Sequence, residues 1–288
     1  MTWRLYQVIF RLRSPIHIGC GKVGNLQRTR PYVTGRVLWG ALTMRLTRDL
    51  AGIHSPAIDS RDYQHIGKQV HQSLAFTYFY PATKSEKGYQ VAWFWKEEAS
   101  FRQHFLSSYS GTALSHPYQS AAVGMLHEVE FISPRTVDEG EPVFLMGYVF
   151  ERDDNQLDWQ AAFMQLQIGG ERGYGWGDIE LVELCETEKN QLFGAPALFN
   201  GGSDRPFIRL LGTEDGPARL LAHALAVNLP TAGDIEPLVG REWRSDGLRH
   251  RYAGQYVAFN GICFTPGSTV RCELDFEVGP FGVWRADG

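Results

Sequence analysis

Trp3-Arg4-Leu5-Tyr6-Gln7-Val8-Ile9-Phe10-Arg11-Leu12-Arg13 is the run of sequence from which the fold can be inferred first. Apolar and polar residues mostly alternate along it, and aromatic and β-branched residues are frequent, which predicts a β-strand. Ser14-Pro15 interrupts this strand, and from Gly35 to Leu50 the apolar spacing changes to three and four residues. That spacing predicts a helix directly after the first strand.

The remaining elements of the first half follow the same logic. Strands are predicted at His127–Ser133, Pro142–Glu151 and Asp178–Leu184, and a short helix at Leu157–Gln167. The order strand, helix, strand, strand, helix, strand is that of a ferredoxin-like βαββαβ domain. The sequence therefore predicts an α+β fold, with residues 53–126 inserted between the first helix and the second strand. Two aromatic runs in this insertion, residues 76–80 and 91–95, are expected to pair as a hairpin.

We expect two domains along the chain. Residues 1–188 form the ferredoxin-like domain, and residues 189–288 form a smaller, degenerate second half that is ferredoxin-like or β-rich. In that half the pattern predicts a helix at Pro217–Leu229 and strands at Tyr256–Thr265 and Val270–Val278.

Composition narrows the class of protein. Of 288 residues, 43% are hydrophobic and 13% aromatic, which excludes wholesale disorder. Long apolar runs and a secretory leader are not seen, and four widely spaced cysteines argue against a disulfide framework or a zinc site. We expect a cytoplasmic protein with no cofactor and no metal.

Charge is distributed unevenly. The chain has 22 arginines and 6 lysines, and arginine suits phosphate binding and base stacking. Residues 1–52 carry nine basic side chains and one acid, Asp49, for a balance of +8, whereas the remainder balances at −12. A basic block within an acidic protein indicates a local site for a polyanion, although a solvated basic face gives the same count.

A glycine-rich segment, Gly169-Gly170-Glu171-Arg172-Gly173-Tyr174-Gly175-Trp176-Gly177, is the strongest local signal. Glycine lets backbone amides approach a ligand closely, and successive free amides bind anions. The segment is not a Walker loop, and it is a poor dinucleotide fingerprint because it follows a helix and enters a strand.

A second glycine segment follows the first strand. Ser14-Pro15-Ile16-His17-Ile18-Gly19-Cys20-Gly21-Lys22 leads, through Arg28 and Arg30, to Tyr32-Val33-Thr34-Gly35-Arg36-Val37-Leu38-Trp39-Gly40-Ala41-Leu42. The helix that begins after Gly35 is predicted to attract phosphate at its N-terminus, which is surrounded by Lys22, Arg28, Arg30 and Arg36. We expect residues 22–36 to meet the Gly169–Gly177 loop in space.

Together these two segments resemble the signatures of the CRISPR-associated RAMP superfamily. The segment of residues 14–42, which we call the first glycine segment because it comes first in the chain, is similar to the superfamily's strand ending in Ser/Thr-Pro-hydrophobic-x-hydrophobic-Gly, with Thr34-Gly35-Arg36 replacing the commoner Pro-Gly-Ser. Residues 169–177 are similar to its glycine-rich loop. The resemblance covers about 50 residues of the first 180, and nothing in the C-terminal third adds to it.

The resemblance implies a subunit of an antiviral CRISPR ribonucleoprotein that binds guide RNA together with other Cas proteins, chiefly backbone RAMP subunits. It looks most like the Cas-five type, which caps the 5′ handle of the guide in type III-like systems, including type III-D and simplified relatives. Residues 53–126 would then form its thumb, the segment that bends over the RNA in such subunits. We expect no catalytic activity, because the sequence holds no convincing acid–base pair and no metal constellation. The implied RNA-binding residues are His17, Lys22, Arg28, Arg30, Arg36, Arg45, Gly169, Gly170, Arg172, Gly173, Tyr174, Gly175 and Trp176.

Three alternatives remain open from the sequence. A RAMP-fold endoribonuclease would use His17 as an acid or base, since histidine suits proton transfer near neutral pH. A backbone RAMP subunit would share the fold. A ferredoxin-like nucleotide-binding or regulatory protein outside CRISPR systems is the third.

Overall fold

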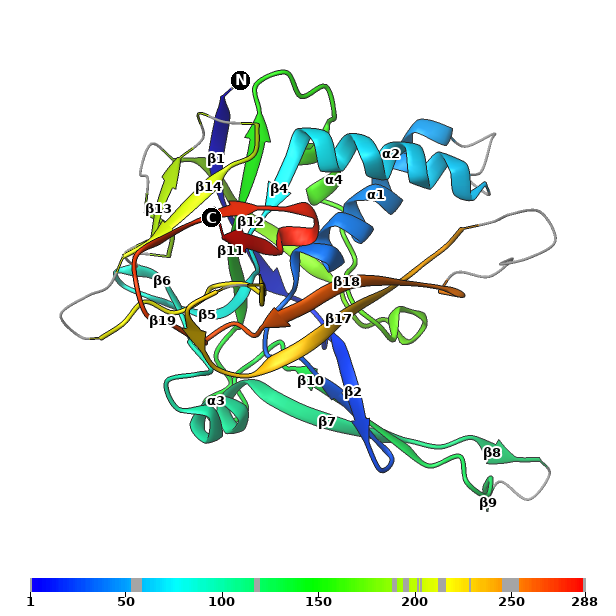
Figure 1. Cartoon of the computed structure of the whole chain (residues 1–288). Helices are drawn as coiled ribbons and strands as arrows, with labels where there is room; N and C mark the ends of the chain where they lie inside the picture. Colours follow the sequence, from blue (N-terminus) through cyan, green and yellow to red (C-terminus); the bar gives the residue numbers. More distant parts are fainter. Residues whose placement is uncertain are drawn as a thin grey trace.

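A computed structural model describes residues 2–52, 59–116, 120–187, 191–193, 197–200, 202, 204–211, 216–227, 229–244 and 254–286. The chain is mostly sheet, with few helices (Figure 1). No helix in these ranges is long and apolar enough to cross a membrane.

The first sheet has the ferredoxin-like strand order. It runs β12 (Ile179–Glu186), β1 (Trp3–Leu12), β11 (Phe144–Arg152), β5 (Tyr80–Ser85) and β6 (Gly88–Val91), and β4 (Leu74–Phe76) also pairs with β11. Neighbouring strands are antiparallel throughout. With α1 (Gly35–Ala51) after β1 and α4 (Trp159–Phe163) after β11, the order is fourth, first, third, second strand. The predicted fold class is confirmed.

Alternation along β1 divides the core into two layers. Val8, Phe10 and Leu12 join the cluster that contains the buried face of α1, the residues of α4 and Ile66 of α2 (Ser60–Ser73). Trp3 and Leu5 point the other way and pack in the cluster formed with the C-terminal half. One face of the first sheet is thus covered by helices, and part of the other face by the second half of the chain.

One strand assignment was wrong. The sequence predicted His127–Ser133 as the second strand of this sheet, but the structure places β4 and β5 there. Both come from the segment that was predicted to be an insertion. Residues 74–76 and 80–82 are consecutively buried, so they lack the alternation by which a strand is recognised. A hairpin turn is found at residues 84–88, because β5 pairs with β6. The two aromatic runs that were predicted to form it do not pair with each other, because Phe76 pairs with Val149 and Tyr80 with Met146 of β11.

The residues 127–132 belong instead to a second sheet, which we call the arm. Its order is β2 (Gly19–Val23), β3 (Leu26–Thr29), β10 (His127–Ile132) and β7 (Leu106–Gly111), and α3 (Glu98–Phe105) precedes β7. β8 (Leu114–Ser115) and β9 (Ser120–Ala121) extend beyond it. Figure 1 shows the arm projecting away from the helices, with β8 and β9 at its far end.

The C-terminal half is built from strands. Its seven-stranded sheet runs β13 (Ala197–Asn200), β14 (Phe207–Leu210), β20 (Leu274–Val278), β21 (Trp284–Ala286), β15 (Ala224–Leu225), β18 (Tyr256–Phe264) and β17 (Ile235–Glu242), and β16 (Thr231–Ala232) pairs with β19 (Thr269–Val270). The two predicted strands are found as β18 and as β19 with β20. The predicted helix at Pro217–Leu229 is wrong: residues 220–224 are all buried, and a helix would expose part of such a run.

Two short 3-10 turns complete the described chain. Arg172–Tyr174 lies inside the glycine-rich loop, and Pro280–Gly282 connects β20 to β21. The second turn packs against the first residue of α1.

Candidate nucleic-acid interface

The glycine-rich loop, residues 169–177, is hydrogen-bonded to the turn that follows β1. The Gly170 amide donates to the His17 carbonyl oxygen at 2.9 Å, and the Gly177 amide donates to Pro15 O at 2.8 Å. The Asp178 amide donates to Ser14 Oγ at 2.8 Å. These hydrogen bonds join the loop to residues 14–17 of the first glycine segment, whereas the sequence predicted that the loop meets residues 22–36.

The glycines of this loop serve two different purposes. At Gly169 a Cβ atom would lie 2.6 Å from His17 O, and at Gly177 it would lie 2.0 Å from Ile168 O, and both residues have left-handed backbone angles. Glycine is required there by close packing. Gly173 and Gly175 have open space where a Cβ would be. Only this outer part of the loop leaves room for a ligand to approach the backbone.

The outer part also carries the exposed side chains. Tyr174 is 81% exposed, and Arg172 is exposed with one guanidinium nitrogen 3.4 Å from Met44 Sδ of α1. An exposed tyrosine beside an arginine can stack a base and bind the adjoining phosphate.

Trp176 has a different place. Its ring packs edge-on against Phe131 of β10 at 5.0 Å and lies 6.4 Å from Tyr109 of β7. The Trp176 side chain thus attaches the glycine-rich loop to the arm, and we remove it from the predicted base-stacking residues. Tyr109, 64% exposed on the arm, was missed because a lone tyrosine among serines carries no signal in the sequence.

His17 is buried beneath the loop. Its Nδ1 lies 2.7 Å from the carbonyl oxygen of Glu130, and its ring packs against Gly19 and Gly170. The Glu130 carboxylate, also buried, accepts the Thr29 amide at 2.9 Å and pairs with Arg102. His17 and Glu130 join β1, β3, β10 and the loop, and neither is placed to touch RNA directly. The prediction of His17 as an RNA contact is corrected on this ground.

Two predicted RNA-binding arginines are ion-paired with the C-terminal half. Arg30 donates two hydrogen bonds to the Glu236 carboxylate, at 2.6 and 3.1 Å. Arg36 pairs with Glu242 at 2.8 Å and stacks over the Phe281 ring at 4.2 Å. Both guanidinium groups are largely buried. Because their charges are neutralised inside the protein, we remove both from the interface.

Arg30 belongs to a longer buried network. The Glu236 carboxylate also lies 2.5 Å from Nε2 of His223, and Nδ1 of His223 lies 2.7 Å from the Tyr78 hydroxyl. Burial alone would raise the pKa of Glu236, but hydrogen bonds from His223 and Arg30 lower it to about 2. Burial lowers the pKa of His223. If His223 is neutral, its Nε2 donates to Glu236 and its Nδ1 accepts from the Tyr78 hydroxyl, so both ring nitrogens have a hydrogen-bond partner.

The N-terminus of α1 is covered rather than open to phosphate. Gly35 is buried, and a Cβ there would lie 2.6 Å from the backbone oxygen of Phe281. The Thr34 side chain makes no capping hydrogen bond. The prediction of a phosphate site at this helix end is wrong, because the Pro280–Gly282 turn occupies the space.

Lys22, Arg28 and Arg172 therefore remain as the open cations of the predicted set. Lys22 is exposed in β2 and Arg28 is half-exposed in β3, and none of the three has an ion pair with any described residue. Arg45 pairs with Asp49 one helical turn away. These three cations, the Gly173 amide and Tyr174 make up the candidate interface, while the Gly175 amide donates to Arg172 O at 3.0 Å.

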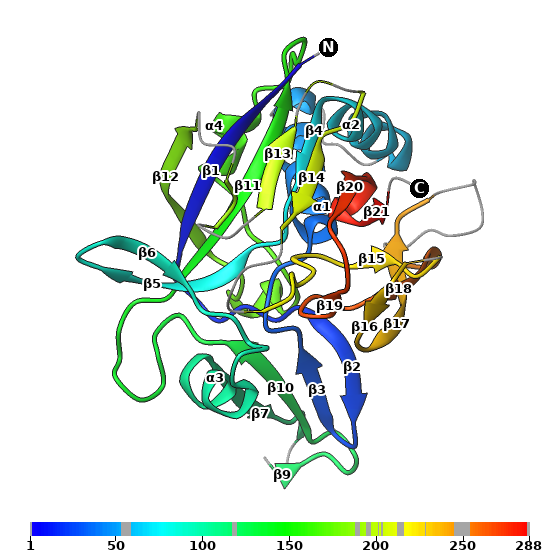
Figure 2. The ribbon, with the colours of Figure 1, turned by 60° about the vertical axis from the view of Figure 1, so that its left-hand side comes forward.

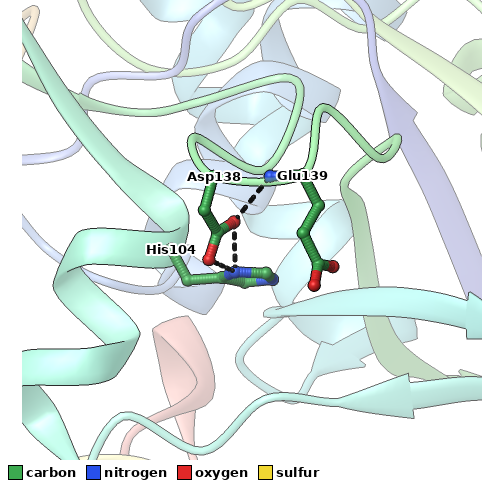
Figure 3. A group of neighbouring side chains, drawn as sticks. All are labelled: His104, Asp138 and Glu139. Carbon is green, nitrogen blue, oxygen red and sulfur yellow. Dashed lines mark hydrogen bonds and ion pairs between the residues drawn. The ribbon is translucent and has the colours of Figure 1, made fainter.

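A cluster of possible metal ligands lies elsewhere, where the end of α3 meets the loop before β11. Figure 3 shows His104 with Asp138 and Glu139, whose ligand atoms all lie within 4.8 Å of one another. His104 Nδ1 is already bound to Asp138 at 2.6 Å, and this contact lowers the pKa of Asp138. The ion pair accounts for the grouping, and we assign no metal role to it.

By sequence, the chain matches no protein-family model and no curated protein. Among solved structures, it is similar to a chain of Type III-B Cmr-beta bound to cognate target RNA and AMPPnP, with 10% identity and a TM-score of 0.49, over 92% of this chain and 85% of that one. A chain of Type III-B Cmr-beta bound to cognate target RNA has 9% sequence identity to this chain and a TM-score of 0.46, over 92% of this chain and 86% of that one. At these values the likeness carries no argument about function, and the fold assignment rests on the strand order above.

Proposed function

We propose that this protein is a non-catalytic, guide-RNA-binding subunit of a CRISPR ribonucleoprotein, which caps the 5′ handle of the guide. Other Cas proteins, chiefly backbone RAMP subunits, would be its protein partners. The two RAMP-like sequence segments support this proposal. They lie at the ends of adjacent strands of a ferredoxin-like sheet and touch through two backbone hydrogen bonds.

One observation carries the proposal. The glycine-rich loop is fixed at both ends by packed glycines, while its middle presents Arg172, Tyr174 and free space at Gly173 and Gly175. A rigid base with an open, charged and aromatic centre suits the binding of a single strand through phosphate contacts and stacking.

The burial of His17 favours a binding role over the endoribonuclease alternative. Cleavage of RNA needs a base and an acid within hydrogen-bond reach of the reacting atoms. The His17 ring is buried and bonded to a backbone carbonyl. Incubation of the protein with repeat RNA tests this point, and site-specific cleavage that His17→Ala abolishes would make the protein a nuclease.

RNA binding is tested with guide RNA that carries its 5′ handle and with the same RNA lacking it. Arg172→Ala with Tyr174→Ala is expected to weaken binding of the complete guide by at least about 5-fold, because one base stack contributes about 1–3 kcal/mol. The control is Arg61→Ala, an exposed arginine on α2. Equal affinity of the loop variant and the control for the guide would refute the loop as the binding site. Equal affinity of the wild type for both RNAs would refute capping of the handle.

A further inference from the structure

A cavity of about 480 Å³ lies on the face of the first sheet that is turned away from α1 and α4. Strand alternation places Gln7 of β1 on this face, opposite Tyr148 of β11. The C-terminal half covers Trp3 and Leu5 at one end of the face but leaves the Gln7 end open. Figure 2 shows the β5–β6 hairpin standing out beside β1 and β11. Tyr89, Gln90 and Val91 of this hairpin line the cavity.

The cavity wall is aromatic. Tyr89 of β6, Trp93 and Phe193 line it. Trp93 is held by stacking on Trp95, with ring centroids 4.6 Å apart and an angle of 22° between the planes. Such a wall suits a flat ring, because every nucleobase has a π-face that stacks on aromatic side chains.

Side-chain amides stand beside the Tyr148 and Thr187 hydroxyls among the polar groups of the cavity. The Gln7 side-chain nitrogen makes only long contacts, 3.5 Å to the Tyr148 hydroxyl and 3.9 Å to Met146 Sδ. Within the described residues its carbonyl oxygen accepts no hydrogen bond. Gln90 adds a second amide, and Lys96 adds a cation at the rim. A side-chain amide presents a donor and an acceptor together, which is the pattern that pairs with the edge of a base.

Phe193 closes the cavity in a strained conformation. Its φ of 58° is in the left-handed region, which bulky residues rarely adopt. The Phe193 amide donates to the Tyr148 hydroxyl at 3.0 Å, and the two rings meet edge to face at 4.9 Å. Such strain persists where the surrounding structure enforces it, and it is frequent at ligand sites.

A separate cleft lined by arginines lies further along β1, beyond Ile9, which is buried between the two. Arg11 lies on the same face as Gln7, about 13 Å further along the strand at the usual rise per residue. Arg11, Arg13 and Arg135 line a second cavity of about 250 Å³. Two acids of β12 face this region: Glu180 pairs with Arg13 at 3.2 Å, and Glu183 lies opposite Ile9. Asp178 is a third acid, 3.9 Å from Arg13, and Glu180 lies directly opposite Arg11 in the ladder. Arg11 nevertheless has no ion pair with any described residue, so its guanidinium is open to a phosphate.

The cleft also leads to the glycine-rich loop. The Arg13 amide donates to the carbonyl oxygen of Asp178, which directly follows that loop. Cavity, cleft and loop therefore follow one another along β1 and its continuation.

We propose that the cavity binds one unstacked base of single-stranded RNA, and that the adjoining phosphates follow β1 to the arginine cleft. This inference rests on the proposed function and extends its site. Gln7 reads the edge of the base, the aromatic wall stacks its face, and Arg11 binds a phosphate.

The test measures how tightly the full chain binds four different 12-nucleotide single strands, of A, of C, of U and one that contains G. Each affinity is measured at two salt concentrations. Gln7→Met keeps the shape of the side chain and removes its amide. It is expected to weaken binding of the preferred strand by about 5-fold or more and to abolish the preference among bases, because one bidentate contact discriminates to that extent. Gln160→Met, exposed on α4, is the control. Arg11→Ala should lower the slope of log K against log salt by about 0.7 and retain the base preference.

Gln90→Leu, on the exposed hairpin, tests the same cavity if Gln7→Met does not fold. Unchanged affinity and base preference in the cavity variants, while the Arg172 and Tyr174 variant loses binding, would refute the cavity and leave the proposed function intact. If the wild type binds no RNA, free nucleoside monophosphates are titrated and followed by saturation-transfer NMR. Binding that Gln7→Met removes would then support the cavity alone, and its absence would refute both. Equal signals from a nucleotide and from phenylalanine would identify a peptide pocket instead.

Discussion

Arg28 and Arg30 lie two residues apart, but the structure gives their side chains opposite surroundings. Arg28 is half-exposed in β3 without an ion pair among the described residues. Arg30 is largely buried and binds Glu236 through two hydrogen bonds. The basic block of the first 52 residues therefore contains two populations: open cations in the arm and the glycine-rich loop, and cations that hold the two halves of the chain together.

The buried population forms a regular arrangement, which we call the latch. Arg30 pairs with Glu236 and Arg36 pairs with Glu242, and both partners are 206 residues further along the chain. The segment after β3 thus runs alongside β17 in the same direction. A count of charges in a window of sequence cannot separate the two populations, because the neutralising acids come from the other end of the chain.

The largest effect on stability is expected when one ion pair of the latch is removed. Arg30→Ala should lower the free energy of unfolding by up to about 3 kcal/mol, because it leaves the partly buried Glu236 carboxylate with His223 as its one remaining partner among the described residues. Arg28→Ala should change it by no more than about 0.5 kcal/mol, as expected for an exposed side chain. Urea denaturation followed by tryptophan fluorescence measures both.

A double substitution sharpens this test. Arg30→Met with Glu236→Leu removes both charges together and should recover part of the loss, because apolar side chains can replace a buried ion pair, while the buried His223 Nε2 loses its acceptor. Equal stabilities of the Arg28 and Arg30 variants would show that the latch contributes nothing.

The second effect is a loss of stability in acid. Burial lowers the pKa of His71 to about 4, and its ring stacks on Trp39 at 4.9 Å and meets Phe281 at 4.6 Å. The unfolded chain takes up this proton near pH 6.5, so stability is complete above that pH and falls between 6.5 and about 4. This group alone accounts for about 3 kcal/mol. His223, whose pKa burial also lowers, acts in the same direction.

At lower pH, Glu236 becomes the group whose protonation lowers stability. Its pKa of about 2 in the folded protein lies under the ordinary 4.5, so its contribution is present above pH 4.5 and is lost as the pH falls toward 2. Thermal melts of wild type and His71→Phe between pH 7 and 4 measure the first step, with exposed His65→Phe as the control. The dependence on pH should be weaker in His71→Phe, and identical curves for all three proteins would contradict the assignment.

The different surroundings of Arg28 and Arg30 also show which features the sequence could predict. Strand β1, helix α1 and the glycine-rich loop were found because alternation, helical spacing and glycine clustering are local signals. A meeting of the loop with the segment after β1 was predicted, but at residues 22–36 and not at residues 14–17, where the hydrogen bonds lie. β4 and β5 were missed because burial on both faces removes the alternation. His17, Arg30 and Arg36 were misplaced because their partners lie 113 to 206 residues away, and no local pattern records such contacts.

The smallest effect on stability is expected for the open cations, and it decides whether the two populations also differ in function. Arg28→Ala should leave the melting temperature unchanged while lowering guide affinity, with the slope of log K against log salt reduced by about 0.7 for each phosphate of a single strand that the variant no longer binds. Arg30→Lys keeps the charge but loses the two-pronged hydrogen bonds to Glu236, so it should lower stability without changing that slope. Measuring both quantities on both variants separates binding from folding. If Arg28→Ala leaves affinity and slope unchanged at every salt concentration, the arm does not contact the guide. The interface would then be confined to the glycine-rich loop and the sheet face beside β1.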